Sequence, residues 1–335
     1  MKTKITKNMF FFVFGVLGLF LLPFFLRNEY FMRVATVVVL YALLASSLNV
    51  INGYSGQFNI GHAAFYCIGA YTAALLAKRF GLSFWLLLPL GGIASAVFSI
   101  LLGVPTLRLR GIYFAMTTLG FSEIVRLVVL NWQSLTRGPM GIPGIPFPEF
   151  FGIQFRSNVH FYYVILGITI VMLFFTRRVL NSRIGRAWIA IREDEAAARA
   201  MGVEVFRLKL LNLAYGAFWA GVAGCFYAFF ASFISPDSFT LDEGFSMLAM
   251  VLVGGQGTLF GPIVGATFLT ILSETFRSIA QYRLIIFGIA ILLTIHLRPQ
   301  GIAGSALLRR KYATTQELPT QVPVSKEVEP DASHP

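Results

Sequence analysis

Long apolar runs recur along this sequence, and each is about 20 residues long, the length at which a helix crosses a lipid bilayer. We place full spans at residues 9–26, 32–51, 60–77, 84–104, 112–130, 160–176, 209–231 and 283–297. Only 13% of the residues are charged, whereas about one quarter are charged in soluble domains. The sequence therefore predicts an all-α fold, a polytopic transmembrane helical bundle of about eight full spans.

Two segments are apolar but interrupted by glycine. Residues 244–276 contain "GGQGTLFGP", and residues 52–76, "NGYSGQFNIGHAAFYCIGAYTAALL", place glycines among polar residues before a small-residue helix. Irregular backbone at membrane depth is tolerated where protein buries it or where it lines a water-filled path. We therefore expect short discontinuous or re-entrant helices in both segments. Their shared "GQ", glycine and small-small-Phe pattern indicates a possible internal repeat.

If the repeat is real, the two interrupted segments face each other across the bundle, which is where transporters place their pathway. His62 is either a proton carrier or, as we favour, a histidine hydrogen-bonded between packed helices. The candidates for lining the translocation path are Asn52, Gln57, Asn59, His62, Gly254, Gly255, Gln256 and Gly257.

Lysine and arginine are distributed unevenly between the loops, and this asymmetry orients the chain. With a cytoplasmic N-terminus, 18 of the 27 lysines and arginines lie in cytoplasmic segments, as the positive-inside rule requires. We therefore expect the N-terminus, the loop 177–208 and the C-terminus to be cytoplasmic. In this orientation the segment 244–276 crosses the membrane twice or not at all.

The two ends of the chain differ in character. The start, "MKTKITKNMFFFVFGVLGLFLLPFF", resembles a signal peptide, but its apolar part is long and no small-residue cleavage site follows, so we expect a retained first span. The polar, proline-containing end lacks periodicity. We expect one transmembrane domain at 1–305 and a disordered cytoplasmic tail at 306–335.

Several kinds of chemistry find no support in the motifs. The sequence contains no Gly-Lys dipeptide and hence no Walker A motif, and no zinc or catalytic-triad spacing occurs. Cys67 and Cys225 lie inside apolar segments, and the net charge of +12 is gathered in a few loops. We expect a chain that is not an enzyme, binds no cofactor or metal, and has the lipid bilayer rather than nucleic acid around it.

One pair of opposite charges lies within a predicted span. Glu123 and Arg126 are three residues apart, which places them on one helix face, where they can neutralise each other. Charges inside a span indicate function by default. The alternative is a structural ion pair that locks two spans together, and we favour it.

A charged, alanine-rich stretch, "AIREDEAAARAMGVEVFRLKLL", occupies residues 190–211. Asp194 and Glu195 lie in the first turn of a short helix, where the helix dipole favours carboxylates, and Arg199 lies near its other end. Gly202 fits as the C-terminal stop, so we expect it to adopt a positive φ.

The alanines of this helix form a small-residue face, typical of a helix that docks into a groove of another protein. A solvated amphipathic loop helix is the alternative, and we interpret Arg192 as part of its solvated approach. The residues that we expect to contact a partner are Asp194, Glu195, Ala196, Ala197, Arg199, Ala200 and Gly202.

At "EAAARAMG" the chain resembles the permeases of ABC importers, in which an EAA-then-glycine loop forms the coupling helix seated in an ATPase. The glycine stands one residue later here than in the general pattern. With "LRGIYFAMTTLGFSEIVRL", "TRGPMGIPGIP" and "GGQGTLFGPIVGATFLTILSE", residues 35–300 resemble the LivM-type permeases of branched-chain amino-acid importers.

This resemblance implies a permease subunit in the bacterial inner (cytoplasmic) membrane. Its implied partners are a related LivH-type permease, two ABC ATPase subunits that use ATP and Mg, and a periplasmic substrate-binding protein. Importers of urea or short amides have similar permeases and stay an alternative. A secondary transporter is a further alternative, although Glu123 is the only deep acidic residue and has Arg126 beside it.

Overall fold

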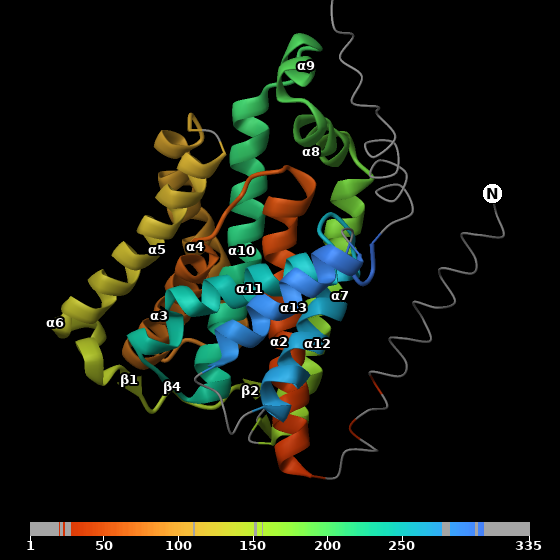
Figure 1. Ribbon diagram of the computed structural model, residues 1–335. Helices are drawn as coiled ribbons and strands as arrows, with labels where there is room; N and C mark the ends of the chain where they lie inside the picture. The colour runs from red at the N-terminus through yellow and green to blue at the C-terminus, as the bar shows by residue number, and fades with distance from the viewer. Residues whose placement is uncertain are drawn as a thin grey trace, which may run out of the picture.

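A computed structural model of the protein describes residues 20, 23, 28–109, 111–150, 153–155, 157–276, 282–298 and 301–304. Figure 1 shows a bundle of helices with two very short antiparallel strand pairs. The helices are α2 (Glu29–Asn49), α3 (His62–Phe80), α4 (Phe84–Thr106), α5 (Ile112–Asn131), α6 (Gln133–Thr136), α7 (Asn158–Leu180), α8 (Arg183–Glu193), α9 (Glu195–Ala200), α10 (Val205–Ala231), α11 (Leu241–Gly254), α12 (Gly261–Thr275) and α13 (Arg283–Leu297).

The remaining elements are short. A π-helical turn, η1 (Val50–Tyr54), continues α2, and two 3-10 turns, η2 (Gly138–Met140) and η3 (Pro236–Phe239), lie in connections. Strand β1 (Ile142–Pro143) pairs with β4 (Phe233–Ile234), and β2 (Glu149–Phe150) pairs with β3 (Ile153–Gln154).

Five of the described helical segments are long and apolar enough to cross a membrane: Glu29–Tyr54, Phe84–Thr106, Ile112–Asn131, Asn158–Leu180 and Val205–Ala231. The predicted polytopic helical bundle is confirmed. Two further predicted spans are helices that fall short of these criteria. They are α3, which is rich in alanine and ends on two basic residues, and α13, which has only 15 residues. The predicted span 9–26 lies almost wholly outside the described residues, and the tail 306–335 lies entirely outside them.

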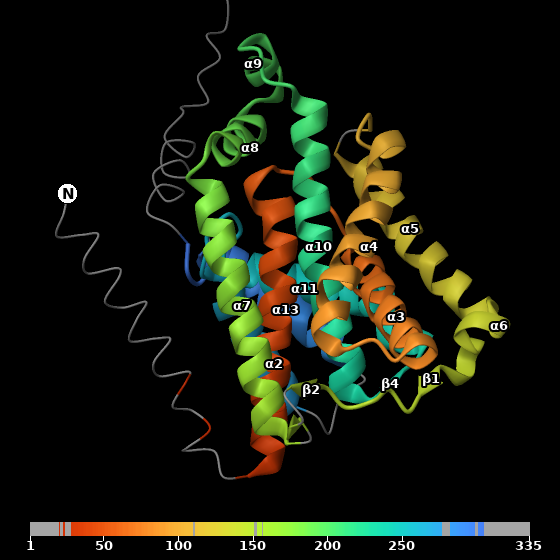
Figure 2. The ribbon, with the colours of Figure 1, turned by 180° about the vertical axis from the view of Figure 1, so that it is seen from behind.

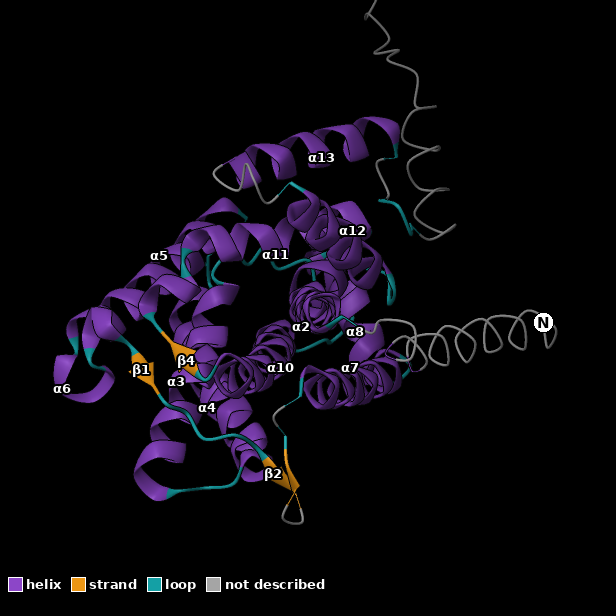
Figure 3. Cartoon of the chain, turned by 90° about the horizontal axis from the view of Figure 1, so that it is seen from below, coloured by secondary structure: helices purple, strands orange, loops and turns teal. Residues whose placement is uncertain are grey.

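Helix α10 is the centre of the bundle. Figure 3 shows it surrounded by α2, α3, α4 and α7, and its most extensive contacts are with α3 and α4. Small residues allow these helices to approach closely, as is common in membrane bundles. At Gly69 of α3 an added Cβ would overlap the backbone of Gly221 on α10, so the two backbones touch there without side chains between them.

The interrupted segment 244–276 forms two short helices, as predicted. Helix α11 has 14 residues and α12 has 15, and they meet closely beside the break, with Gly265 of α12 against the carbonyl oxygen of Met250 on α11. Helix α12 also lies along α2 in the opposite direction (Figure 1). After α13 the chain returns to the end of α11, where the Ile302 N–H donates to the carbonyl oxygen of Val253 at 2.9 Å.

Helices α8 and α9 project from one end of the bundle, between α7 and α10 (Figures 1 and 2). We call residues 181–204 the α8–α9 loop. The buried Trp188 of α8 donates from Nε1 to the carbonyl oxygen of Leu208 on α10 at 2.9 Å. Ile191, Ala198 and Val205 form a small buried cluster below α9. The loop is therefore packed onto the start of α10.

The contact between α3 and α10 generates a stability prediction. We expect Gly69→Ala to destabilise the bundle by about 1–3 kcal/mol, the usual cost of overpacking, because its Cβ would meet backbone that no side-chain rotation can clear. The measurement is the thermal melting temperature of the detergent-solubilised protein. Gly120→Ala on α5 is the matched control, since an added Cβ meets nothing within 4 Å there. Equal melting temperatures for the two variants would contradict the prediction.

Candidate functional site

The first break, residues 50–61, is where α2 leaves the helical path. The backbone widens into the π-helical turn η1 and then runs without regular structure from Ser55 to Gly61. Asn52 fixes this stretch, because its Nδ2 donates to the carbonyl oxygen of Asn59 and its Oδ1 accepts from the Asn59 N–H, both at 3.1 Å. An asparagine that bonds nearby backbone in this way competes with the helix.

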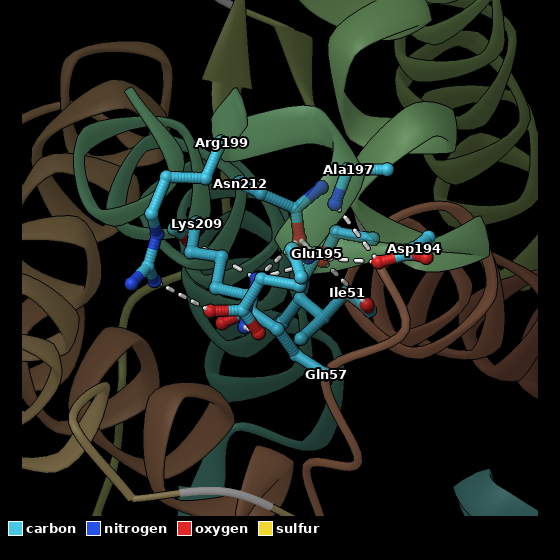
Figure 4. A network of polar contacts seen from close by, with 10 residues as sticks. Ile51, Gln57, Asp194, Glu195, Ala197, Arg199, Lys209 and Asn212 are labelled. Atoms are coloured by element: carbon cyan, nitrogen blue, oxygen red, sulfur yellow. Dashed lines mark hydrogen bonds and ion pairs between the residues drawn. The ribbon is translucent and has the colours of Figure 1, made fainter. Parts of the chain in front are cut away.

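A polar network from α10 completes the first break (Figure 4). Asn212 Nδ2 donates to the carbonyl oxygen of Val50 at 3.0 Å, and Asn212 Oδ1 accepts from Ser55 Oγ at 2.8 Å. Gln57 Nε2 donates to the same Oδ1 at 3.1 Å and to the carbonyl oxygen of Lys209 at 3.1 Å. Side chains therefore satisfy backbone groups that a continuous helix would pair with itself.

The second break, residues 255–260, lies directly against the first. Asn49 at the end of α2 donates to the carbonyl oxygen of Thr258 and accepts from the Gly257 N–H, both at 2.8 Å. Gln256 Nε2 donates to the carbonyl oxygen of Asn52 at 2.9 Å. At Gly53 an added Cβ would come within 2.5 Å of the Gly257 nitrogen. The two interrupted segments thus face each other, as the sequence predicts.

The predicted path residues are brought together but are mostly buried within this chain. Asn52, Asn59 and His62 are at most 1% exposed. His62 lies 2.7 Å from Ser47 Oγ through Nε2, which agrees with a histidine hydrogen-bonded between helices. These side chains hold the breaks in shape. Their role in lining a path stays a prediction, and so does the internal repeat.

Helix α9 lies where the sequence predicts a short helix, but Asp194 is its N-cap rather than a residue of its first turn. Asp194 caps its N-terminus, with Oδ1 accepting from the N–H groups of Ala196 and Ala197 at 2.8 and 3.0 Å (Figure 4). Gly202 follows the helix with a φ of 82°, a left-handed conformation that glycine adopts without strain. This capping fixes α9 as a short helix of six residues.

The surface of α9 is divided between an anchored side and an exposed side. Glu195 accepts from Lys209 of α10 at 2.7 Å and from Arg199 at 3.0 Å, and Ala198 is buried. Met201, which directly follows the helix, is 84% exposed. The three alanines of the predicted docking face are also exposed, namely Ala196, Ala197 and Ala200.

Arg192 corrects the sequence interpretation. We placed it on a solvated approach to α9, but its side chain is only 24% exposed and its Nη1 donates to the carbonyl oxygen of Gly53 in the first break. A charged residue in a charged stretch gives no sign of such a contact, because the partner is 139 positions away.

Asn49, Ser55 and Asn212 are further residues that the sequence analysis missed. The sequence feature that could have identified them is a polar residue within or beside an apolar span, which indicates a functional role or a specific hydrogen bond.

Glu123 and Arg126 pair within α5. Arg126 Nη2 lies 2.5 Å from Glu123 Oε1, and Arg126 Nε donates to both carboxylate oxygens at 3.1 Å. The two side chains are 31% and 23% exposed. The predicted mutual neutralisation is observed, and because both partners lie on α5 this contact itself joins no second helix.

Comparison with known proteins identifies a family that matches most of the chain. The family described as the branched-chain amino acid transport system permease component matches residues 30–295, which include both breaks and the α8–α9 loop. The high-affinity branched-chain amino acid transport system permease protein LivM of Salmonella typhimurium is 40% identical over 292 residues, covering 80% of this chain and 69% of that protein. The LivM protein of Escherichia coli gives the same values. The LivH permease protein of Salmonella typhimurium is 26% identical, covering 79% of this chain and 91% of that protein. No solved structure matches this chain.

The ion pair on α5 generates a double-mutant prediction. We expect Glu123→Gln alone to lower membrane yield and uptake more than Glu123→Gln combined with Arg126→Gln, because the single change leaves one charge unpaired. We expect the single change to destabilise the protein by less than the roughly 3–5 kcal/mol that a fully buried unpaired charge costs, since both side chains are partly exposed. Membrane yield and substrate uptake are measured for both variants. A double variant that is the more damaged would contradict mutual neutralisation.

Proposed function

Because the chain belongs to the family of permease components of branched-chain amino acid transport systems, we propose that it carries branched-chain amino acids along a path controlled by its two breaks. The observation that carries this proposal is that the two breaks lie against each other, joined directly by Gln256 and through Asn49 at the end of α2. Irregular backbone at membrane depth is the feature that transporters place at their pathways. The names of the relatives favour this substrate class over urea or short amides.

A second permease completes the path in this proposal. Relatives of this chain include proteins named LivM and proteins named LivH, so a pair of different but related permeases is the expected arrangement. A periplasmic substrate-binding protein delivers the amino acid to the pair. The parts of the first break that are exposed in this chain, Gly56 and Phe58, are available to such a partner or to the substrate.

ATP hydrolysis by two partner ATPase subunits drives the cycle. The sequence of this chain has no Walker A motif, so ATP and Mg belong to the partners. The exposed alanine face of α9 docks into a groove of an ATPase, because small side chains allow two backbones to approach closely. Closure of the ATPases moves the α8–α9 loop, and the bundle opens alternately to the two sides of the membrane.

The alanine face generates the main test of this function. We expect Ala197→Trp and Ala200→Trp to insert into the membrane normally, yet to release the ATPases and lower uptake at least about tenfold, the effect of losing about 1.4 kcal/mol of docking energy. Gly202→Val is expected to act similarly, because valine does not tolerate a φ of 82°. The measurements are co-purification of the ATPases with tagged permease and substrate uptake.

The matched control for this test is Ala190→Trp. Ala190 is also an exposed alanine of the loop but lies on α8, so bulk there leaves the α9 face free. If all three α9 variants retain the ATPases and transport normally, α9 is not the coupling helix and the solvated-helix alternative holds.

The proposed orientation places the α8–α9 loop and the C-terminus in the cytoplasm of a bacterium, with the chain in the inner membrane. We expect cysteines at Arg183 and Thr315 to resist a membrane-impermeant thiol reagent added to intact cells, whereas a cysteine at Met140, near the opposite end of the bundle, reacts. The native Cys67 and Cys225 are buried and give little background. Labelling of Arg183→Cys or Thr315→Cys from outside would refute the orientation.

A further inference from the structure

Arg192 stands where the α8–α9 loop meets both breaks. It lies in the last turn of α8, and its Nη1 donates to the carbonyl oxygen of Gly53. Its Nη2 also lies 3.5 Å from the carboxylate of the neighbouring Glu193. A charged donor to a backbone carbonyl is among the stronger hydrogen bonds in a protein. One side chain of the loop therefore holds the first break directly.

Glycines in both breaks make room for this side chain. An added Cβ at Gly56 would come within 3.0 Å of Arg192 Cγ, and one at Gly257 would collide with the guanidinium. Gly257 belongs to the second break, so the guanidinium touches the seam between the two breaks rather than one of them alone. Both glycines also have a positive φ, 70° at Gly56 and 75° at Gly257.

The first break is thus held by side chains and backbone of two helices, α10 and α8. From α10 it is held by Asn212 and by the carbonyl oxygen of Lys209, and from α8 it is held by Arg192. Trp188 ties α8 to α10, and the Glu195–Lys209 pair ties α9 to α10. A displacement of α9 is therefore shared by α8 and the start of α10. Among the contacts that hold the first break, the one made by Arg192 also lies against Gly257 of the second break.

We infer that Arg192 is a positioning residue that transmits displacement of the α8–α9 loop to the two breaks, so that ATP-driven movement of α9 opens and closes their seam. This inference rests on the proposed function and adds to it a residue outside the docking face. Without the Arg192 contact, the loop still carries its ATPases, but its movement reaches the first break from α10 alone. The consequence is ATP hydrolysis that is poorly coupled to transport.

The test compares two arginines of the same helix. Arg192→Gln removes the contact with Gly53, whereas Arg186→Gln removes a bond of 2.9 Å to the carbonyl oxygen of Asn181 inside the loop. Each complex is purified with its ATPases and binding protein, reconstituted into proteoliposomes and supplied with leucine. The readouts are ATPase retention and the number of ATP molecules hydrolysed per leucine transported.

We expect R192Q to retain its ATPases and to raise the ATP consumed per leucine by about tenfold, the equilibrium effect of losing one charge-assisted hydrogen bond. R186Q is expected to stay within about twofold of wild type, because its contact lies inside the loop. A purely structural role would instead lower assembly and activity together, without changing this ratio. An R192Q ratio equal to that of wild type, or equal increases in both variants, would overturn the inference.

A conservative variant covers the case in which R192Q does not assemble. R192K keeps the charge and can still donate to a carbonyl but lacks the planar fork of arginine, so we expect a smaller rise in ATP per leucine. An unchanged ratio in R192K would then count against the inference. Failure of the proposed function is separate, because it shows in the wild-type complex itself as absence of bound ATPases or of leucine uptake.

Discussion

A backbone that leaves the helical path inside a bilayer must find partners for its N–H and C=O groups within the protein, because lipid offers none. The first break meets this demand with side chains from three places: Asn52 in the break itself, Asn212 on α10 and Arg192 at the end of α8. Asn49 does the same for the second break. Among the described residues, the buried asparagines all lie in or against the interruptions, namely Asn49, Asn52, Asn59 and Asn212. Their bonds help to fix which helices lie together.

The two breaks behave as one unit because each supplies bonding groups to the other. The carbonyl oxygen of Asn52 accepts from Gln256, and the N–H of Gly257 donates to Asn49. Moving one break alone would strand buried donors and acceptors, which is costly in a protein interior. Moving both together with α8 and α10 keeps most bonds intact. A permease needs this property, since its path must change shape without exposing unpaired backbone to lipid.

The sequence predicts what depends on nearby residues and fails where distant residues meet. Apolar length and glycine spacing predicted the spanning helices and the interruption between α11 and α12. The helix-dipole argument placed the start of α9 near Asp194, and Gly202 was predicted as its stop. The contact of Arg192 with Gly53 joins residues 139 positions apart, and no local pattern announces it. The bond between Asn212 and Val50 was missed for the same reason, since helix packing rather than spacing brings these residues together.

Several charged residues of the α8–α9 loop make contacts that hold the loop in place. Asp194 caps the N-terminus of α9, and Glu195 accepts hydrogen bonds from Arg199 and Lys209. Arg192 donates to the carbonyl oxygen of Gly53 inside the bundle. Each of these charges thus shapes the loop or fastens it, and none of the contacts involves an alanine side chain of the exposed face. That face carries only exposed alanine side chains, while these contacts fasten its support to the bundle, as the proposed transmission of force requires. A helix of six residues is too short to be stable alone, so the charged contacts around α9 are what hold it in place, and the proposed transfer of movement from its exposed face to the breaks depends on them.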